Sequence, residues 1–190
     1  EVDFDEIKLN FGLKVRNVKA KIITLSTYQK ALKLLGWGPK DLHRRNKIQI
    51  IILILAFKCG LRYGEIVSLR VFDYQYGPLP VLLIRNHRFH HNKSDRARRL
   101  LPLKELLNEH EFEFVKNYFE YRLREYKHMN NELLFGELTK TGGVVHCGEL
   151  VQPIVDTIRT ITGDMKLSFH SLRHSFATWF TVRLMLREDN

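Results

Sequence analysis

Two imidazoles and one guanidinium near the end of the chain are spaced so that they can act together. His170, Arg173 and His174 lie three and four residues apart, and residues at those spacings share one face of an α-helix. Ser168 stands just before them and is a suitable N-cap for such a helix. The planar five-donor fork of an arginine suits a phosphate well. The stretch is therefore a candidate site for an anionic group.

The same helix is expected to be amphipathic. Its apolar stripe consists of Leu172, Phe176 and Phe180. If this stripe faces a core, Arg173 lies at the edge of buried surface, where a charge is costly unless it is paired. The nearest carboxylates along the chain are Asp164 and Glu188, so the guanidinium needs an acid from elsewhere or a bound anion. An ordinary amphipathic helix with solvated basic residues explains this stretch equally well.

A second arginine lies at a turn that follows the most apolar run of the chain. Residues 48–57 are apolar at every position but Gln49, and basic residues precede them. A buried strand is one interpretation of this run, because it is rich in β-branched residues. We favour a central helix, since about 18 positions pass without a turn signal. Arg62 then lies where this helix leaves the core, and a simple junction with Arg62 paired to Glu65 is the alternative.

A basic hairpin is expected between residues 79 and 101. Strand candidates are Val71–Phe72, Leu79–Ile84 and Leu100–Leu101. Between the last two, residues 85–99 hold six Lys or Arg, three His and one Asp, with a polar tip near residues 92–95. Such a concentration of positive charge suits an element that contacts a phosphate backbone, although a solvated hairpin is the simpler interpretation. The histidines have no Cys or acidic cluster beside them, so no metal site is expected.

The net charge of the chain agrees with a polyanionic partner. The chain has 31 Lys and Arg against 21 Asp and Glu, a formal net charge of +10. Its 44% of hydrophobic residues is typical of a globular domain rather than a disordered one. The two cysteines form no disulfide framework and have no metal-ligand spacing, which fits an intracellular chain, and a buried Cys59 is expected. The longest apolar run is too short to span a membrane, and we recognise no signal peptide.

Further helices are expected along the chain. A capping box over residues 26–29 predicts a short helix that ends near Gly36. Residues 111–127 have aromatic and aliphatic side chains at helical spacing, and residues 147–162 form another helix that Gly163 stops. Residues 1–24 alternate loosely and are expected to form an N-terminal arm or an inter-domain linker.

Two motifs in this order carry a family resemblance. They are Gly60-Leu61-Arg62-Tyr63-Gly64-Glu65 and His170-Ser171-Leu172-Arg173-His174-Ser175-Phe176-Ala177-Thr178, separated by the basic hairpin. Over about residues 25–183 the chain resembles the catalytic domain of tyrosine recombinases, the phage integrase family. The resemblance implies an α+β, mainly α fold, in which a helical catalytic domain over residues 25–190 includes a small antiparallel sheet.

The resemblance also implies a role for each matching residue. Arg62 and Arg173 match the two arginines that clamp the non-bridging oxygens of the scissile phosphate. His170 would donate to the same phosphate and assist proton transfer. Lys93 looks like the lysine that protonates the leaving 5′-oxygen, although Arg96 or Arg98 lie close enough in the hairpin to be confused with it.

Other residues are implied as supports or as DNA contacts. Glu65 matches the acid that supports the first arginine, and His174 follows the family pattern as a structural residue. The basic residues expected to contact DNA are Arg44, Arg45, Lys47, Arg88, Arg96, Arg98 and Arg99. No cofactor is implied. The implied partner is double-stranded DNA, with no membrane and a cytoplasmic, DNA-associated location.

The chain departs from the family at the nucleophile. The family's tyrosine follows the second arginine, whereas the seven tyrosines of this sequence all precede His170. We therefore expect a truncated catalytic domain that cannot form the covalent intermediate alone. The full-length protein is expected to act as a tetramer on DNA, and this piece to be a monomer. A DNA-binding or regulatory module derived from an integrase is the alternative function.

Overall fold

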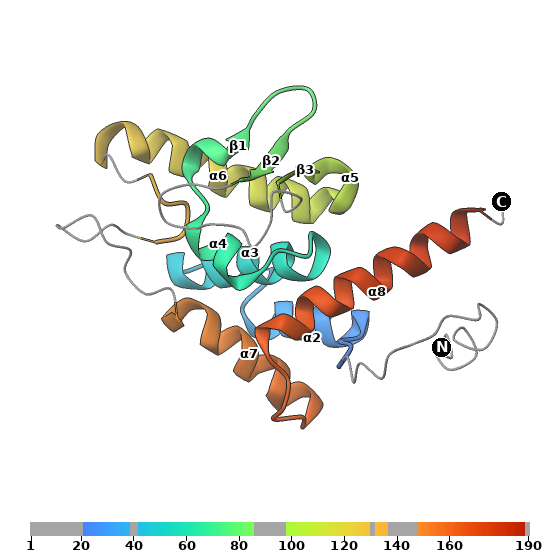
Figure 1. Ribbon diagram of the computed structural model, residues 1–190. Coiled ribbons are helices and arrows are strands. Elements are labelled where there is room, and N and C mark those ends of the chain that lie inside the picture. Colours follow the sequence, from blue (N-terminus) through green and yellow to red (C-terminus); the bar gives the residue numbers. More distant parts are fainter. Residues whose placement is uncertain (1–20, 39–41, 86–97, 130–131, 137–147, 189–190) are drawn as a thin grey trace.

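The computed structural model describes residues 21–38, 42–85, 98–129, 132–136 and 148–188 (Figure 1). Its helices are α2 (Leu25–Leu34), α3 (Arg44–Lys58), α4 (Tyr63–Ser68), α5 (Leu103–Leu106), α6 (Glu109–Met129), α7 (Gly148–Thr162) and α8 (Phe169–Glu188). A 3-10 turn, η1 (Val71–Asp73), precedes three strands, β1 (Tyr74–Gln75), β2 (Val81–Ile84) and β3 (Arg99–Pro102). This confirms the predicted α+β, mainly α fold.

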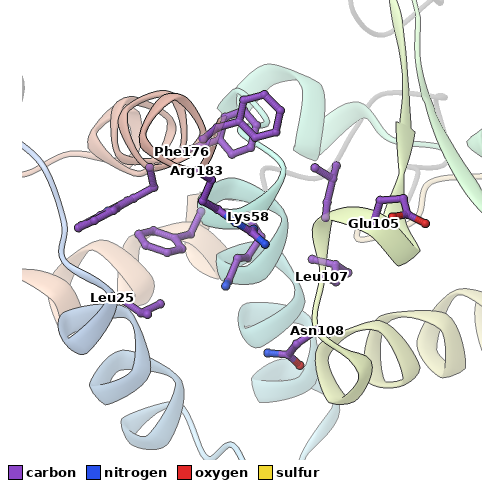
Figure 2. Close-up of a pocket in the computed structure, with 11 residues that line it drawn as sticks. Leu25, Lys58, Glu105, Leu107, Asn108, Phe176 and Arg183 are labelled. Atoms are coloured by element: carbon purple, nitrogen blue, oxygen red, sulfur yellow. The ribbon is translucent and has the colours of Figure 1, made fainter. Parts of the chain in front are cut away.

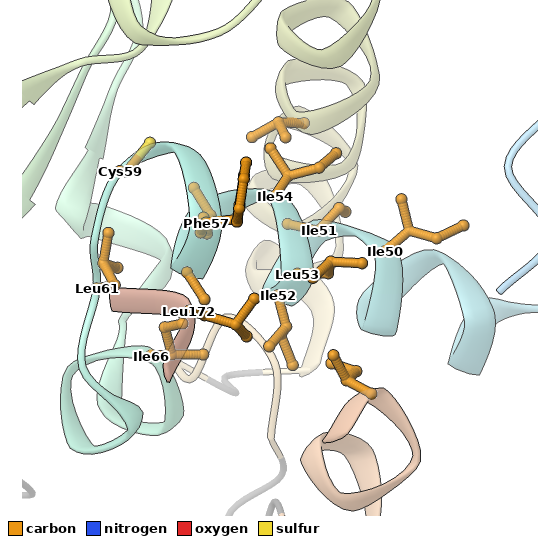
Figure 3. Packing of buried hydrophobic residues seen from close by; sticks show 14 of the residues in the cluster. Ile50, Ile51, Ile52, Leu53, Ile54, Phe57, Cys59, Leu61, Ile66 and Leu172 are labelled. Atoms are coloured by element: carbon orange, nitrogen blue, oxygen red, sulfur yellow. The ribbon is translucent and has the colours of Figure 1, made fainter. Parts of the chain in front are cut away.

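Helix α3 forms the centre of the domain. Every side chain from Ile50 to Ala56 is fully buried, and the helix packs against α2, α4, α6, α7 and α8. Figure 3 shows its isoleucines surrounded by side chains from neighbouring elements, among them Leu172 of α8. Burial on all sides outweighs the weak helix propensity of β-branched residues, because each fully buried aliphatic side chain contributes about 1.5–3 kcal/mol. The predicted central helix and the buried Cys59 are confirmed.

The strands form one antiparallel sheet in the order β1-β2-β3. Leu82 pairs with Leu101 across β2 and β3, which confirms the predicted hairpin, although its tip lies outside the described residues. The prediction of a strand at Val71–Phe72 is wrong. These residues form η1 because the carboxylate of Asp73 accepts a hydrogen bond from the Arg70 backbone at 2.9 Å and closes a tight turn.

The start of α2 also differs from the prediction. The N-cap is Thr24, whose hydroxyl accepts a hydrogen bond from the Thr27 backbone at 3.1 Å, so the capping box predicted over residues 26–29 is wrong. A threonine hydroxyl at the N-cap satisfies one of the free N–H groups of the first turn, and Ser26 and Gln29 then lie inside the helix. Helices α6 and α7 match their predicted ranges to within two residues.

Residues 21–24 pack along α8 rather than apart from the domain. The Ile23 backbone donates to the buried hydroxyl of Ser175 at 2.7 Å, and the Trp179 indole donates to the Ile23 carbonyl at 3.0 Å. Lys21 pairs with Asp164 just before α8. The end of the predicted arm is thus attached to the helix that carries His170 and Arg173, while residues 1–20 lie outside the described part.

The predicted apolar stripe of α8 is only partly buried. Leu172 is fully buried, Phe176 is half-buried, and Phe180 is 41% exposed. Phe180 stacks on Phe176 at 5.4 Å instead of entering the core, because the second half of α8 extends past the central helix (Figure 1). Among the helices that the structure describes, none is both long enough and apolar enough to cross a membrane.

Candidate functional site

Arg62 is placed by the first turn of α4. It occupies the N-cap position, and its backbone N–H donates to Glu65 Oε2 at 2.8 Å. Its guanidinium donates to Glu65 Oε1 at 3.0 Å. The Glu65 side chain is 1% exposed, whereas that of Arg62 is 45% exposed. A buried carboxylate therefore holds a guanidinium whose other face is open to solvent.

A second arginine binds the same carboxylate. Arg99, in β3, donates to both oxygens of Glu65 at 3.0 and 2.9 Å, so four hydrogen bonds converge on one carboxylate. Burial acts to raise the pKa of Glu65, but the hydrogen bonds from Arg99 and Arg62 outweigh it and hold the pKa below its usual range. The sequence predicts that Glu65 supports Arg62. It does not predict that Arg99, 34 residues from Glu65, binds the same carboxylate.

Arg173 enters from the first turns of α8. Its guanidinium is half-buried and donates to the backbone carbonyl of Gly60, two residues before Arg62. Burial lowers the pKa of Arg173, and repulsion from Arg62 lowers it further, while Glu65 opposes this effect. The two arginines thus lie close enough to repel each other around one carboxylate. Such a cluster has an excess of positive charge and is suited to an anion.

The two histidines of α8 confirm the predicted shared face. The rings of His170 and His174 lie 4.4 Å apart and nearly perpendicular to each other. His170 is exposed, and His174 is half-buried. Just before them, Phe169 packs edge-on against Tyr63, the residue after Arg62, with ring centroids 6.0 Å apart. This contact joins the start of α8 to the start of α4, where the two arginines lie.

The remaining predicted contacts include residues outside the described part of the chain and residues at the start of α3. Lys93, Arg88 and Arg96 fall outside the described residues, and Arg98 is exposed just before β3. The other three are at the start of α3, about 20 Å along that helix from the end nearest Arg62. They are Arg44, Arg45 and Lys47. Arg44 pairs with Glu125 at 3.2 Å, and Arg45 donates to the Glu149 carbonyl at 2.9 Å. Their contact with DNA stays a prediction.

An apolar hollow of about 340 Å³ lies between α8, the start of α2, the end of α3 and the segment around α5 (Figure 2). It neighbours the arginine cluster through Phe176. Phe176 and Lys58 contribute to its wall, and Phe176 also covers Gly60. Its lining includes none of the three arginines Arg62, Arg99 and Arg173. Within the described ranges, no group of three or more metal-ligating side chains is found. The polar contacts that define the cluster are those of Arg62 and Arg99 with Glu65 and of Arg173 with the Gly60 carbonyl.

The chain belongs to the phage integrase family, whose sequence profile matches residues 24–183. The fold is that of a tyrosine recombinase catalytic domain. XerA recombinase has a TM-score of 0.57 and 17% identity, with 89% of this chain and 52% of that chain covered. For XerH recombinase bound to its difH substrate, the TM-score is 0.57 and the identity 17%, with 85% and 43% covered.

The Tn1549 transposon integrase, in complex with transposon right end DNA, has a TM-score of 0.56 and 15% identity, covering 96% of this chain and 58% of that one. This chain therefore spans about half the length of the solved relatives it matches. No curated protein matches its sequence. At these sequence identities the structural similarity shows the fold alone.

Proposed function

We propose that this chain is the catalytic part of a site-specific recombinase that breaks and rejoins double-stranded DNA through a phosphotyrosine intermediate. The observation that carries the proposal is that Arg173 donates to the Gly60 carbonyl, two residues before Arg62, whose guanidinium is held by the buried carboxylate of Glu65. Two guanidiniums held on rigid helix ends, with His170 on the same helix as Arg173, suit a phosphate that gains negative charge during reaction. Membership of the phage integrase family over residues 24–183 supports the proposed class of reaction.

In the proposed reaction each of these groups acts on the scissile phosphate or on its leaving oxygen. A tyrosine oxygen attacks the phosphorus, and the 5′-oxygen leaves with a proton from Lys93. Arg62 and Arg173 donate to the two non-bridging oxygens, and His170 donates to the phosphate and assists proton transfer. Removing one such donor typically costs about 3–4 kcal/mol, which is a few hundred-fold in rate. The opposite reaction, attack by a 5′-hydroxyl on the phosphotyrosine, rejoins the strands and needs the same stabilisation.

The attacking tyrosine is not one of the seven in this sequence. All of them precede His170, and Tyr28, Tyr74 and Tyr118 are buried with pKa values raised by burial. Tyr63, next to Arg62, packs against Phe169. The proposal therefore places the nucleophile outside these 190 residues, in a protein that acts on DNA in the cytoplasm as a tetramer.

A second candidate function starts from the same observation, that all seven tyrosines of this sequence precede His170. A module that keeps the phosphate cluster but has no tyrosine would bind DNA and regulate a reaction without catalysing it. Both candidates predict affinity dominated by phosphate contacts. The logarithm of the observed binding constant should then fall linearly with the logarithm of the salt concentration, with a slope of about −0.9 per phosphate neutralised.

Covalent trapping distinguishes the two functions. The longest polypeptide that the reading frame encodes is incubated with a nicked suicide DNA substrate and run on a denaturing gel beside the 190-residue chain. A DNA-linked band from the longer polypeptide, lost in Arg173→Ala and kept in Arg124→Ala, supports the recombinase. Arg124 is an exposed arginine of α6, so its substitution controls for the change in charge. DNA binding with no covalent band supports the regulatory module, and a full band from Arg173→Ala contradicts the assigned site.

A further inference from the structure

Both strands of the hairpin are attached at their bases by an arginine that binds a buried carboxylate. At the end of β2, Arg85 donates to Asp73 at 2.8 Å. At the start of β3, Arg99 donates to Glu65 at 3.0 and 2.9 Å. Each carboxylate also accepts a hydrogen bond from the backbone N–H three residues before it. The two attachments therefore pair the same kinds of groups on similar backbone turns, with one hydrogen bond described from Arg85 and two from Arg99.

The two attachments differ in whether the carboxylate also binds a second guanidinium. Glu65 also accepts from the guanidinium of Arg62 at 3.0 Å. At the corresponding position before Asp73, the guanidinium of Arg70 is instead directed to Glu132 at 3.2 Å. Only the Arg99 attachment is thus connected, through one shared carboxylate, to an arginine of the candidate site.

We propose that Arg99 is a positioning residue for Arg62. Its two nitrogens fix both oxygens of Glu65, and the fixed carboxylate holds the Arg62 guanidinium in the orientation that receives a phosphate. The consequence for DNA rests on the function proposed above. Arg99 was expected from the sequence to contact DNA directly, and in this proposal it acts through its neighbour.

The geometry gives a physical reason for this division of roles. The Arg99 side chain is 26% exposed and that of Arg62 is 45% exposed, so the more open guanidinium is the one available to a ligand. Without Arg99, the hydrogen bonds described on the Glu65 carboxylate come from the backbone and guanidinium of Arg62 itself, the group that is to be oriented. A planar fork on the other side fixes the carboxylate independently of Arg62, because it must meet both oxygens at once. A lysine supplies the charge without the fork.

The first test measures the order of Arg62 in the 190-residue chain without DNA. Nitrogen-15 relaxation of the Arg62 Nε–H group is compared in the wild type, Arg99→Lys and Arg85→Lys. We expect the order parameter of Arg62 to fall in Arg99→Lys and to stay at the wild-type value in Arg85→Lys, which changes the arginine–carboxylate bond at the base of the other strand. An unchanged order parameter in Arg99→Lys overturns the proposal. If Arg99→Lys does not fold, Arg99→Gln replaces it.

The second test measures binding to duplex DNA by fluorescence anisotropy for Arg99→Lys, Arg62→Ala and the double variant. We expect Arg99→Lys to weaken binding about tenfold, the order seen when the partner that orients a ligand-contacting group is removed. In the Arg62→Ala background, Arg99→Lys should have no further effect. An equal loss in both backgrounds overturns the proposal, since Arg99 then meets the DNA itself.

The two tests separate this inference from the proposed function. If the wild-type chain shows no salt-dependent DNA binding, the proposed function fails, and the order parameter of Arg62 alone decides whether Arg99 positions it. If DNA binds but Arg62 is equally ordered with and without Arg99, the positioning role fails and the proposed function stands.

Discussion

The guanidinium of Arg173 donates a hydrogen bond to the backbone carbonyl of Gly60, 113 residues earlier in the chain. This bond joins the first turns of α8 to the segment that leaves α3 and leads into Arg62. At the same place the ring of Phe176 covers the Gly60 backbone. One glycine thus sets the distance between the two elements that carry the arginines.

Gly60→Ala should disturb both the backbone and this packing. Gly60 has φ of 65°, where a residue with Cβ costs about 1–2 kcal/mol, and the added methyl would overlap Phe176, for which overpacking typically costs about 1–3 kcal/mol more. We expect unfolding in urea to show a loss of about 2–5 kcal/mol. Gly163→Ala is the control, because Gly163 has φ of 70° with nothing within 4 Å of the added methyl. Equal losses in the two variants would show that the Phe176 contact has no effect.

Ser175→Ala should detach the segment before α2 from α8. The Ser175 hydroxyl is fully buried, accepts from the Ile23 backbone at 2.7 Å and donates to the Ser171 carbonyl. Its removal leaves a buried N–H without an acceptor, which costs about 1–3 kcal/mol. We expect that loss in thermal unfolding, together with faster amide exchange at Ile23. Thr178→Ala removes only a bond within α8 and should leave Ile23 protected. Unchanged exchange in Ser175→Ala would contradict this attachment.

Stability should fall in acid through Glu65. The hydrogen bonds from Arg99 and Arg62 outweigh burial and lower its pKa in the folded chain, so the folded state binds its proton less readily than the unfolded state does. The stabilisation is present above the unfolded pKa, about 4.3, and is lost as the pH falls through the folded pKa. We expect the free energy of unfolding of Glu65→Gln to depend less on pH below about pH 4.5 than that of the wild type. Parallel pH profiles would show that Glu65 does not titrate differently on folding.

The salt dependence of DNA binding should separate the two basic regions. Arg173→Ala is expected to reduce the slope of log K against log salt by about 1, because one phosphate contact is lost. Arg44→Ala should reduce it less, since Arg44 is paired with Glu125 at the far end of α3. Anisotropy titrations with duplex DNA across a range of salt concentrations measure both slopes. An equal reduction would place the start of α3 on the DNA backbone as well.

Local patterns in the sequence determined much of this protein. The apolar run before Gly60, the turn at Arg62, the hairpin and the face shared by His170 and His174 follow from interactions between residues close in the chain. Such patterns are readable because a helix or a hairpin repeats its contacts every few residues. The family motifs depend on the same short spacings, so the candidate site is predicted without any long-range contact.

The tertiary structure decided which distant groups meet. It placed Arg99 on the carboxylate of Glu65, Ile23 on Ser175 and Arg173 on the Gly60 carbonyl, and it left Phe180 exposed at the outer half of α8. An arginine in a basic hairpin has the same local sequence whether it meets a phosphate or a buried acid. The choice depends on how β3 packs beside α4, because an ion pair forms only where the chain brings both partners within hydrogen-bond distance.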